Sequence, residues 1–194
     1  ISLCCFSAGC QSKPERKTEK KIPGGCETCE AVLEYGNRKL NAIDTLPDFN
    51  ETGPKLEITG TIYKRDGKTP AKDVILYIYH TDQKGEYSPR GNDRGRHGYI
   101  RGWIKTGADG RYTFYTLVPA AYPGREAPAH IHPVIKEEGY EPYWVDEYLF
   151  DDDPILTQGE RNNQPGRGGN GILKTTRRAD GILTAKRDII LGLN

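Results

Sequence analysis

The sequence has no marked excess of charge of either sign and no long apolar run. Its 28 Lys and Arg residues nearly balance its 27 Asp and Glu residues, which leaves a formal net charge of +1. Binding to a phosphate backbone needs a concentrated positive field, so we expect no nucleic-acid partner. No stretch approaches the ~20 apolar residues of a membrane-spanning helix. The 194 residues, of which 35% are hydrophobic, suit one globular domain with polar extensions.

The chain contains no methionine and only five cysteines, three of which lie among the first ten residues. Residues 1–9 are a short segment that ends in small residues, and Cys10 follows directly. This arrangement resembles the end of a bacterial lipoprotein signal peptide, although Ser7 stands where an aliphatic residue is usual. We therefore expect residues 1–9 to be a signal remnant and residues 10–25 a polar tether. A lipid on Cys10 would hold an exported protein in the periplasm or on the cell surface; the alternative is a chance cysteine.

The two remaining cysteines, Cys26 and Cys29, enclose two residues. A redox-active pair of this spacing needs a βαβ context, which does not follow. A structural zinc site needs two more Cys or His residues nearby, and these are also missing. We expect a disulfide at the start of the folded domain, which we place at residues 26–194.

A long helical period is also missing, and short runs typical of β-strands begin at Leu56. The run 74–79 is apolar throughout, which predicts a strand buried on both faces. The Asp-Gly turn within 107–110 predicts a hairpin between its two flanking strands. The segment 158–171, rich in Gly, Asn and Arg, predicts a mobile surface loop. The predicted strands are 56–63, 74–79, 99–106, 111–117, 129–136, 143–150, 172–176 and 181–191.

Such short strands, separated by Gly- and Pro-rich turns, predict an all-β fold, an antiparallel β-sandwich with long loops that carry a metal site. The metal is indicated by His130 and His132, because residues two apart in a strand project from the same face. An isolated pair of this kind is as readily a pair of surface histidines. Two tyrosines in turn-bounded segments, Tyr87 and Tyr122, offer further ligands.

Together these segments resemble the core of the intradiol ring-cleavage dioxygenases over about residues 56–154. The matching stretches, in order, are 78–88, 101–102 with 106–112, 119–123 and 128–132. The resemblance implies a mononuclear iron(III) bound by Tyr87, Tyr122, His130 and His132, with water or hydroxide completing the shell. Two phenolates are hard, anionic donors that favour iron(III) over iron(II).

The resemblance also implies the reaction. Its substrates would be a catechol-type compound and O2, and the ring would open between the two hydroxyl-bearing carbons to give a muconate-type diacid. Tyr122 would be a ligand first and a base second. The family commonly has Arg where this chain has Ala127, and Arg125 or Arg101 could take over its catalytic role. Glu147 stands where Gln is common, which would disfavour carboxylated catechols.

Several alternatives stay open on the sequence alone. The segments 60–62, 66–70 and 109–112 also resemble transthyretin-like and carboxypeptidase-regulatory modules, which bind at surfaces without catalysis. The substitution at Ala127 leaves room for a protein that binds iron or catechol but turns it over weakly. A zinc hydrolase is disfavoured, because tyrosinates are unusual zinc ligands. The oligomeric state stays open.

Four further residues are ambiguous at this stage. We interpret His80 as structural, while His97 could contact substrate or pack in the protein. Trp103 and Trp144 could line a pocket for the ring, although large aromatic residues at strand positions usually belong to the core.

Overall fold

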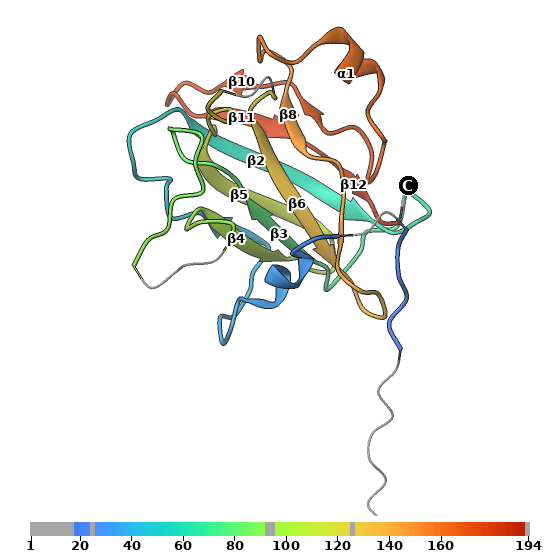
Figure 1. Ribbon diagram of the computed structural model, residues 1–194. Coiled ribbons are helices and arrows are strands. Elements are labelled where there is room, and N and C mark those ends of the chain that lie inside the picture. Colours follow the sequence, from blue (N-terminus) through green and yellow to red (C-terminus); the bar gives the residue numbers. More distant parts are fainter. Residues whose placement is uncertain (1–17, 24–25, 92–95, 125–126, 193–194) are drawn as a thin grey trace, which may run out of the picture.

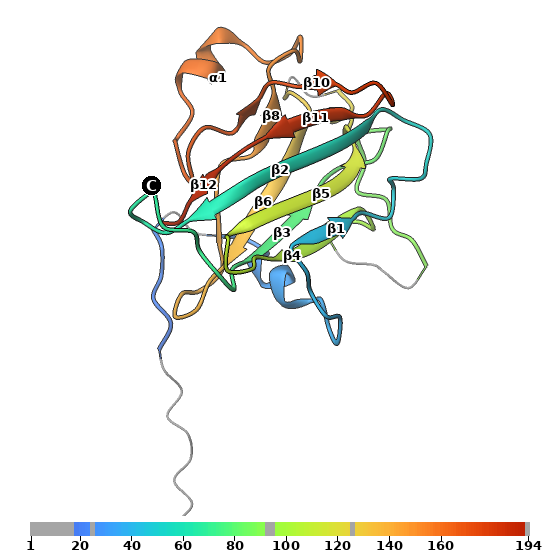
Figure 2. The same ribbon diagram turned by 180° about the vertical axis from the view of Figure 1, so that it is seen from behind.

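The structure is a computed structural model that describes residues 18–23, 26–91, 96–124 and 127–192. It consists of two six-stranded sheets. Figures 1 and 2 show the sheets stacked face to face, with β3 and β6 in one layer and β2 and β5 in the other. The predicted all-β sandwich is confirmed. The central pairs β2–β5, β3–β4 and β3–β6 are antiparallel, and parallel pairs join β1 to β5, β11 and β12 to β2, and β9 to β8.

The first sheet has the order β1 (Ile43–Thr45), β5 (Arg111–Leu117), β2 (Lys55–Tyr63), β11 (Leu183–Lys186) and β10 (Thr176–Arg177), with β12 (Ile189–Ile190) also beside β2. The second has the order β4 (Arg101–Lys105), β3 (Ile75–Tyr79), β6 (His130–Lys136), β8 (Tyr148–Phe150) and β9 (Ile172–Leu173), with β7 (Tyr143–Trp144) beside β6.

The main core lies between the sheets, because β2 and β5 alternate fully buried residues with more exposed ones. Strand β2 turns Leu56, Ile58 and Ile62 inward, where all three are fully buried. Strand β3 is buried on both faces, as predicted. Its Leu76 and Ile78 face the main core, while Tyr77 packs in a second cluster with Trp103, Val134 and the 3-10 helix η1 (Cys29–Leu33).

The hairpin predicted around 107–110 is wrong. The turn itself forms, with Gly110 N donating to Gly107 O at 3.1 Å. However, β4 before it and β5 after it belong to different sheets, so the turn crosses from one layer to the other. Each strand has a better partner: β4 pairs along its whole length with β3, and β5 with β2.

The predicted strand 143–150 is interrupted in the structure, and so are the last two predicted strands. Residues 145–147 separate β7 from β8, and Glu147 in this break contacts His132 of β6. Part of the predicted loop 158–171 is a helix, α1 (Gln158–Asn162). Thr157 begins it with a capping box, in which Thr157 and Glu160 each accept from the other's backbone N–H.

The N-terminal region is described only in part. Cys26 and Cys29 form the predicted disulfide. Within the predicted tether, Lys20 makes a β-bridge with Tyr140, so this residue lies against the domain. Cys10 lies outside the described residues, and its lipid anchor stays a prediction. Among the described residues, no helix combines the length and apolarity needed to cross a bilayer.

Candidate metal centre

Four side chains that could bind a metal meet at one end of β6. His130 and His132 lie on this strand, Tyr87 lies in the loop after β3, and Tyr122 lies in the loop after β5. The hydroxyl oxygen of Tyr122 is central: it lies 2.6 Å from Tyr87 Oη, 3.1 Å from His130 Nε2 and 3.3 Å from His132 Nε2. The structure thus brings together all four residues that the sequence resemblance selects.

The two tyrosine-bearing loops are held together by a close backbone contact. Gly85 has φ +78°, and a Cβ at this position would lie 2.1 Å from the carbonyl oxygen of Ala121. Position 85 therefore needs glycine for two reasons: the backbone has a positive φ, and there is no space for a Cβ atom. The carboxylate of Asp82 organises the same loop by accepting from Lys84 N, Glu86 N and Ser88 Oγ.

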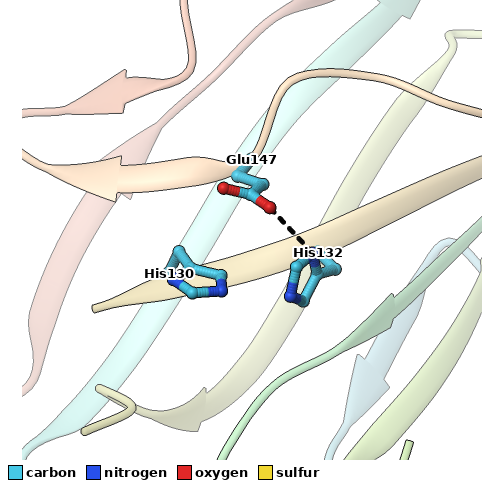
Figure 3. Close-up of side chains that lie close together, drawn as sticks. All are labelled: His130, His132 and Glu147. Carbon is cyan, nitrogen blue, oxygen red and sulfur yellow. Dashed lines mark ion pairs between the residues drawn. The ribbon is translucent and has the colours of Figure 1, made fainter. Parts of the chain in front are cut away.

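Each histidine is oriented by a second partner on its far nitrogen. His130 Nδ1 donates to Pro128 O at 2.8 Å, and His132 Nδ1 lies 3.0 Å from Glu147 Oε1. Figure 3 shows the Glu147 carboxylate reaching the ring of His132 while His130 lies beside it on the strand. These partners direct both Nε2 atoms toward Tyr122, which is the usual way in which proteins fix metal-ligating imidazoles.

Glu147 is itself close enough to be considered as a ligand. One ligand atom from each of His130, His132 and Glu147 can be chosen so that all three lie within 4.8 Å of one another. However, Glu147 contacts His132 through Nδ1, whereas the hydroxyl oxygen of Tyr122 lies at Nε2. We therefore interpret Glu147 as the residue that orients His132.

Burial dominates the electrostatics of the centre. It raises the pKa of Tyr87 far above the usual value, and the hydrogen bond with Tyr122 raises it further. Burial also lowers the pKa of His130, which favours the neutral imidazole that a metal needs. Burial opposes the ionisation of Glu147, but the contact with His132 outweighs it and the pKa of Glu147 is lowered. A cation at Tyr122 would reverse the preference of both phenols and favour phenolates.

An aromatic stack supports His132 from the side, which the sequence analysis did not foresee. The centroid of the Tyr79 ring lies 4.6 Å from that of His132. It lies 3.6 Å from the ring centroid of His97, so Tyr79 stacks on both imidazoles. His97 contacts Tyr77 Oη through Nδ1 and Thr28 Oγ1 through Nε2, so both of its nitrogens have partners in the protein. This placement makes His97 a packing residue.

A cavity of about 470 Å³ opens beside the centre. Trp144 lines it, whereas Trp103 is buried in the second cluster. Ala127, where the family commonly has Arg, also lines it. The full set of lining residues is Tyr122, Ala127, Pro128, His130, His132, Trp144, Asp146, Glu147, Leu149, Glu160, Gln164 and Pro165.

The other candidate residues lie elsewhere. Arg101 forms an ion pair with Glu34 at 2.6 Å and lines a separate pocket with His97. Arg125 lies outside the described residues. His80 is buried, with Nδ1 bonded to Thr81 O and Nε2 to Thr116 Oγ1, in keeping with a structural role.

Comparisons with known proteins agree with this arrangement. The family model described as "Dioxygenase" matches residues 34–160. Catechol 1,2-dioxygenase 1 of Acinetobacter lwoffii is 34% identical over 143 residues, covering 71% of this chain and 43% of the relative. Catechol 1,2-dioxygenase 2 of the same organism is 26% identical, covering 81% and 62%. The chain thus spans only about half the length of these curated relatives.

Solved structures support the fold. The dioxygenase domain of a dioxygenase and carbohydrate-binding protein fusion from Streptomyces sp. SirexAA-E has a TM-score of 0.61 and 25% identity, covering 83% of this chain and 96% of that one. An intradiol ring-cleavage dioxygenase from Tetranychus urticae has a TM-score of 0.58 at 21% identity, covering 79% and 87%. With the matched family model and the catechol 1,2-dioxygenase relatives, these findings assign the chain to the intradiol dioxygenase family.

Proposed function

We propose that this protein binds one iron(III) ion through Tyr87, Tyr122, His130 and His132 and uses it to cleave catechol-type rings with O2. The ring opens between the two hydroxyl-bearing carbons, and both oxygen atoms enter the diacid product. The observation that carries the proposal is the position of Tyr122 Oη, within 3.3 Å of one further phenol oxygen and two imidazole nitrogens.

The donor set fits iron(III). Two phenol oxygens are hard donors that become anionic when bound, and imidazoles bind metals as neutral donors, so the set suits a hard trivalent cation better than zinc or ferrous iron. When bound, the ion acts as a Lewis acid that acidifies a chelating catechol and makes its ring reactive toward O2.

The protein's own side chains then have separate tasks. Tyr122 Oη, at the centre of the cluster, accepts a proton from the incoming catechol. Glu147 holds the ring of His132 in place through Nδ1. Pro128, Trp144 and Leu149 give the cavity apolar walls that hold an aromatic ring and exclude water.

The test is an aerobic visible spectrum with iron analysis, repeated under nitrogen with catechol. We expect a tyrosinate-to-iron(III) band that shifts to longer wavelength when catechol binds. Tyr122→Phe removes one phenolate, so the band should change and turnover should fall by about 100-fold or more. A protein that stays colourless after iron reconstitution contradicts the proposal.

A second candidate is an iron protein that binds catechol without cleaving it. Ala127 supports this reading, because it lines the cavity where the family commonly has Arg. Oxygen consumption separates the two: a catechol-dependent uptake of one O2 per diacid formed supports the dioxygenase, whereas the spectral shift without uptake supports the binding protein.

The proposal for location rests on the sequence alone. We propose that the protein is exported and attached to a membrane surface through a lipid on Cys10. Incorporation of labelled fatty acid in a bacterial host, and its loss in Cys10→Ala, would support this; equal labelling of both proteins would contradict it.

A further inference from the structure

The cavity beside the metal centre has an acidic lining. Asp146, Glu147 and Glu160 contribute carboxylates, while the two histidines of the centre are its only basic residues among those described. Three arginines lie near this region without lining the cavity, and Arg187 among them bonds to the backbone carbonyl of Asp146. Arg161 forms an ion pair with Asp151, and the guanidinium of Arg167 lies over the ring of Trp144.

Asp146 is an unusual wall residue because it is buried and incompletely bonded. It is 2% exposed, and its Oδ2 accepts from Gly166 N at 2.7 Å. Its Oδ1 has no hydrogen-bond partner among the described residues. Arg187 bonds to the carbonyl oxygen of Asp146 and not to its carboxylate. Nε and Nη2 of Arg187 are likewise without a hydrogen-bond partner among the described residues, so the Asp146 carboxylate gives the wall a buried negative charge with unused hydrogen-bonding capacity beside it.

Glu160 supplies a charge at the α1 side of the cavity. Its Oε2 accepts from Thr157 N and Thr157 Oγ1, both at 2.8 Å, and no bond within the described part of the chain uses Oε1. The hydrogen bonds from Thr157 lower the pKa of Glu160, so the side chain is ionised at neutral pH. Its free oxygen is available to a cationic group.

The positions of these residues set the direction of a bound substrate. The two hydroxyls of a catechol belong at Tyr122, His130 and His132. A substituent on the ring then extends along the cavity toward α1 and the segment that follows it, where Glu160, Gln164 and Pro165 form the wall. Figure 1 shows α1 at the same end of the molecule as β8.

We infer that this site takes catechols whose ring carries a basic amine, and disfavours those that carry a carboxylate. The inference rests on the proposed function. At neutral pH an ammonium group on a two-carbon arm meets Glu160 beside the buried negative charge of Asp146, whereas a carboxylate at the same ring position meets like charge.

Three probes test this in the iron-loaded protein: 4-(2-aminoethyl)catechol, 4-methylcatechol and 3,4-dihydroxyphenylacetate, which carry a cationic, a neutral and an anionic substituent at the same ring position. Affinity is measured under nitrogen from the shift of the visible band, and kcat/KM from oxygen uptake. We expect the amine to exceed the carboxylate about tenfold or more in both, with 4-methylcatechol between them. Added salt should reduce the difference.

Glu160→Gln is the informative variant, because Gln also serves in a capping box and α1 should stay intact. We expect the preference for the amine over 4-methylcatechol to fall roughly threefold to fivefold, the effect of one partly exposed ion pair. Glu138→Gln removes the same charge from an exposed site outside the cavity and should leave the preference unchanged.

The outcomes separate the two proposals. If 4-methylcatechol is cleaved but the carboxylate is bound and cleaved as well as the amine, or Glu160→Gln and Glu138→Gln behave alike, the inference is wrong and the proposed function stands. If none of the three probes is bound or cleaved, the proposed function fails and the inference fails with it.

Discussion

The carboxylate of Glu147 lies 3.0 Å from Nδ1 of His132, on the ring atom opposite the one that faces Tyr122. This contact joins the segment between β7 and β8 to β6 and orients the imidazole. Removal of such an orienting partner typically weakens metal binding by about 10- to 100-fold. We therefore expect Glu147→Ala to lower iron affinity by roughly this factor, as measured by competition with a chelator.

Glu147→Gln is the matched variant, because its amide oxygen can still accept from Nδ1. We expect it to keep iron affinity within about threefold of the wild type. An equal loss of iron in both variants would instead assign Glu147 a direct, charge-dependent role at the metal.

The close contact at Gly85 predicts that a larger side chain there would disturb the metal centre. A Cβ at this position would lie 2.1 Å from Ala121 O, so Gly85→Ala must push the Tyr87 loop away from the Tyr122 loop. We expect a loss of roughly 3 kcal/mol in unfolding free energy and a much weaker visible iron band. Denaturant unfolding and the spectrum measure the two effects.

Gly91 provides the control, because it has φ +60° but open space around its Cβ position. Gly91→Ala should cost only about 1 to 2 kcal/mol, the penalty of a left-handed backbone conformation, and should keep the iron band. Retention of the band in Gly85→Ala would show that close contact of the two loops is unnecessary.

Tyr79 supports His132 through its ring and not through its hydroxyl. The hydroxyl makes no hydrogen bond to any residue in the described ranges, whereas the ring stacks on both His132 and His97. We expect Tyr79→Leu to lose about 1 to 2 kcal/mol of stability and part of the iron affinity. Tyr79→Phe should leave both unchanged, and a matching loss in Tyr79→Phe would contradict the stacking argument.

The lowered pKa of His97 predicts that the stability of the fold depends on pH. Burial lowers the pKa of His97 to about 4, against about 6.5 for an unperturbed histidine. Between these values the unfolded chain binds more protons than the folded one, so this residue makes stability fall as the pH drops from about 6.5 toward 4. Between about pH 7 and about pH 4.5, His97 should lower the free energy of unfolding by about 1 to 2 kcal/mol, a figure that allows for solvent screening.

His97→Phe keeps a ring against Tyr79 but cannot titrate. We expect this variant to be less stable at neutral pH, because it loses the bonds to Tyr77 and Thr28. Its stability should nevertheless fall less steeply with acidification, as followed by urea unfolding at several pH values. An identical slope for both proteins would show that His97 is not the titrating group.

The sequence predicted the outline of the sandwich well. Strand β5 begins and ends at the predicted residues, and the inward residues of β2 follow the predicted alternation. It failed at residues 143–150, which we predicted as one strand. The run contains Asp146 and Glu147, two poor strand formers, and residues 145–147 separate β7 from β8, each of which pairs with a different part of β6.

The sequence by itself determined which residues could form the centre. His130 and His132 share a face because strand side chains alternate, which is a property of neighbouring residues. The order of the tyrosines and histidines along the chain carries the family resemblance. Only the tertiary structure decided that Tyr87 meets Tyr122, that Glu147 orients His132 and that Tyr79 stacks between two imidazoles. It also placed Arg101 in another pocket and Glu160 on the wall of the cavity. The physical reason is that these contacts join segments distant in the chain, so they depend on how two sheets pack and where each loop crosses between them.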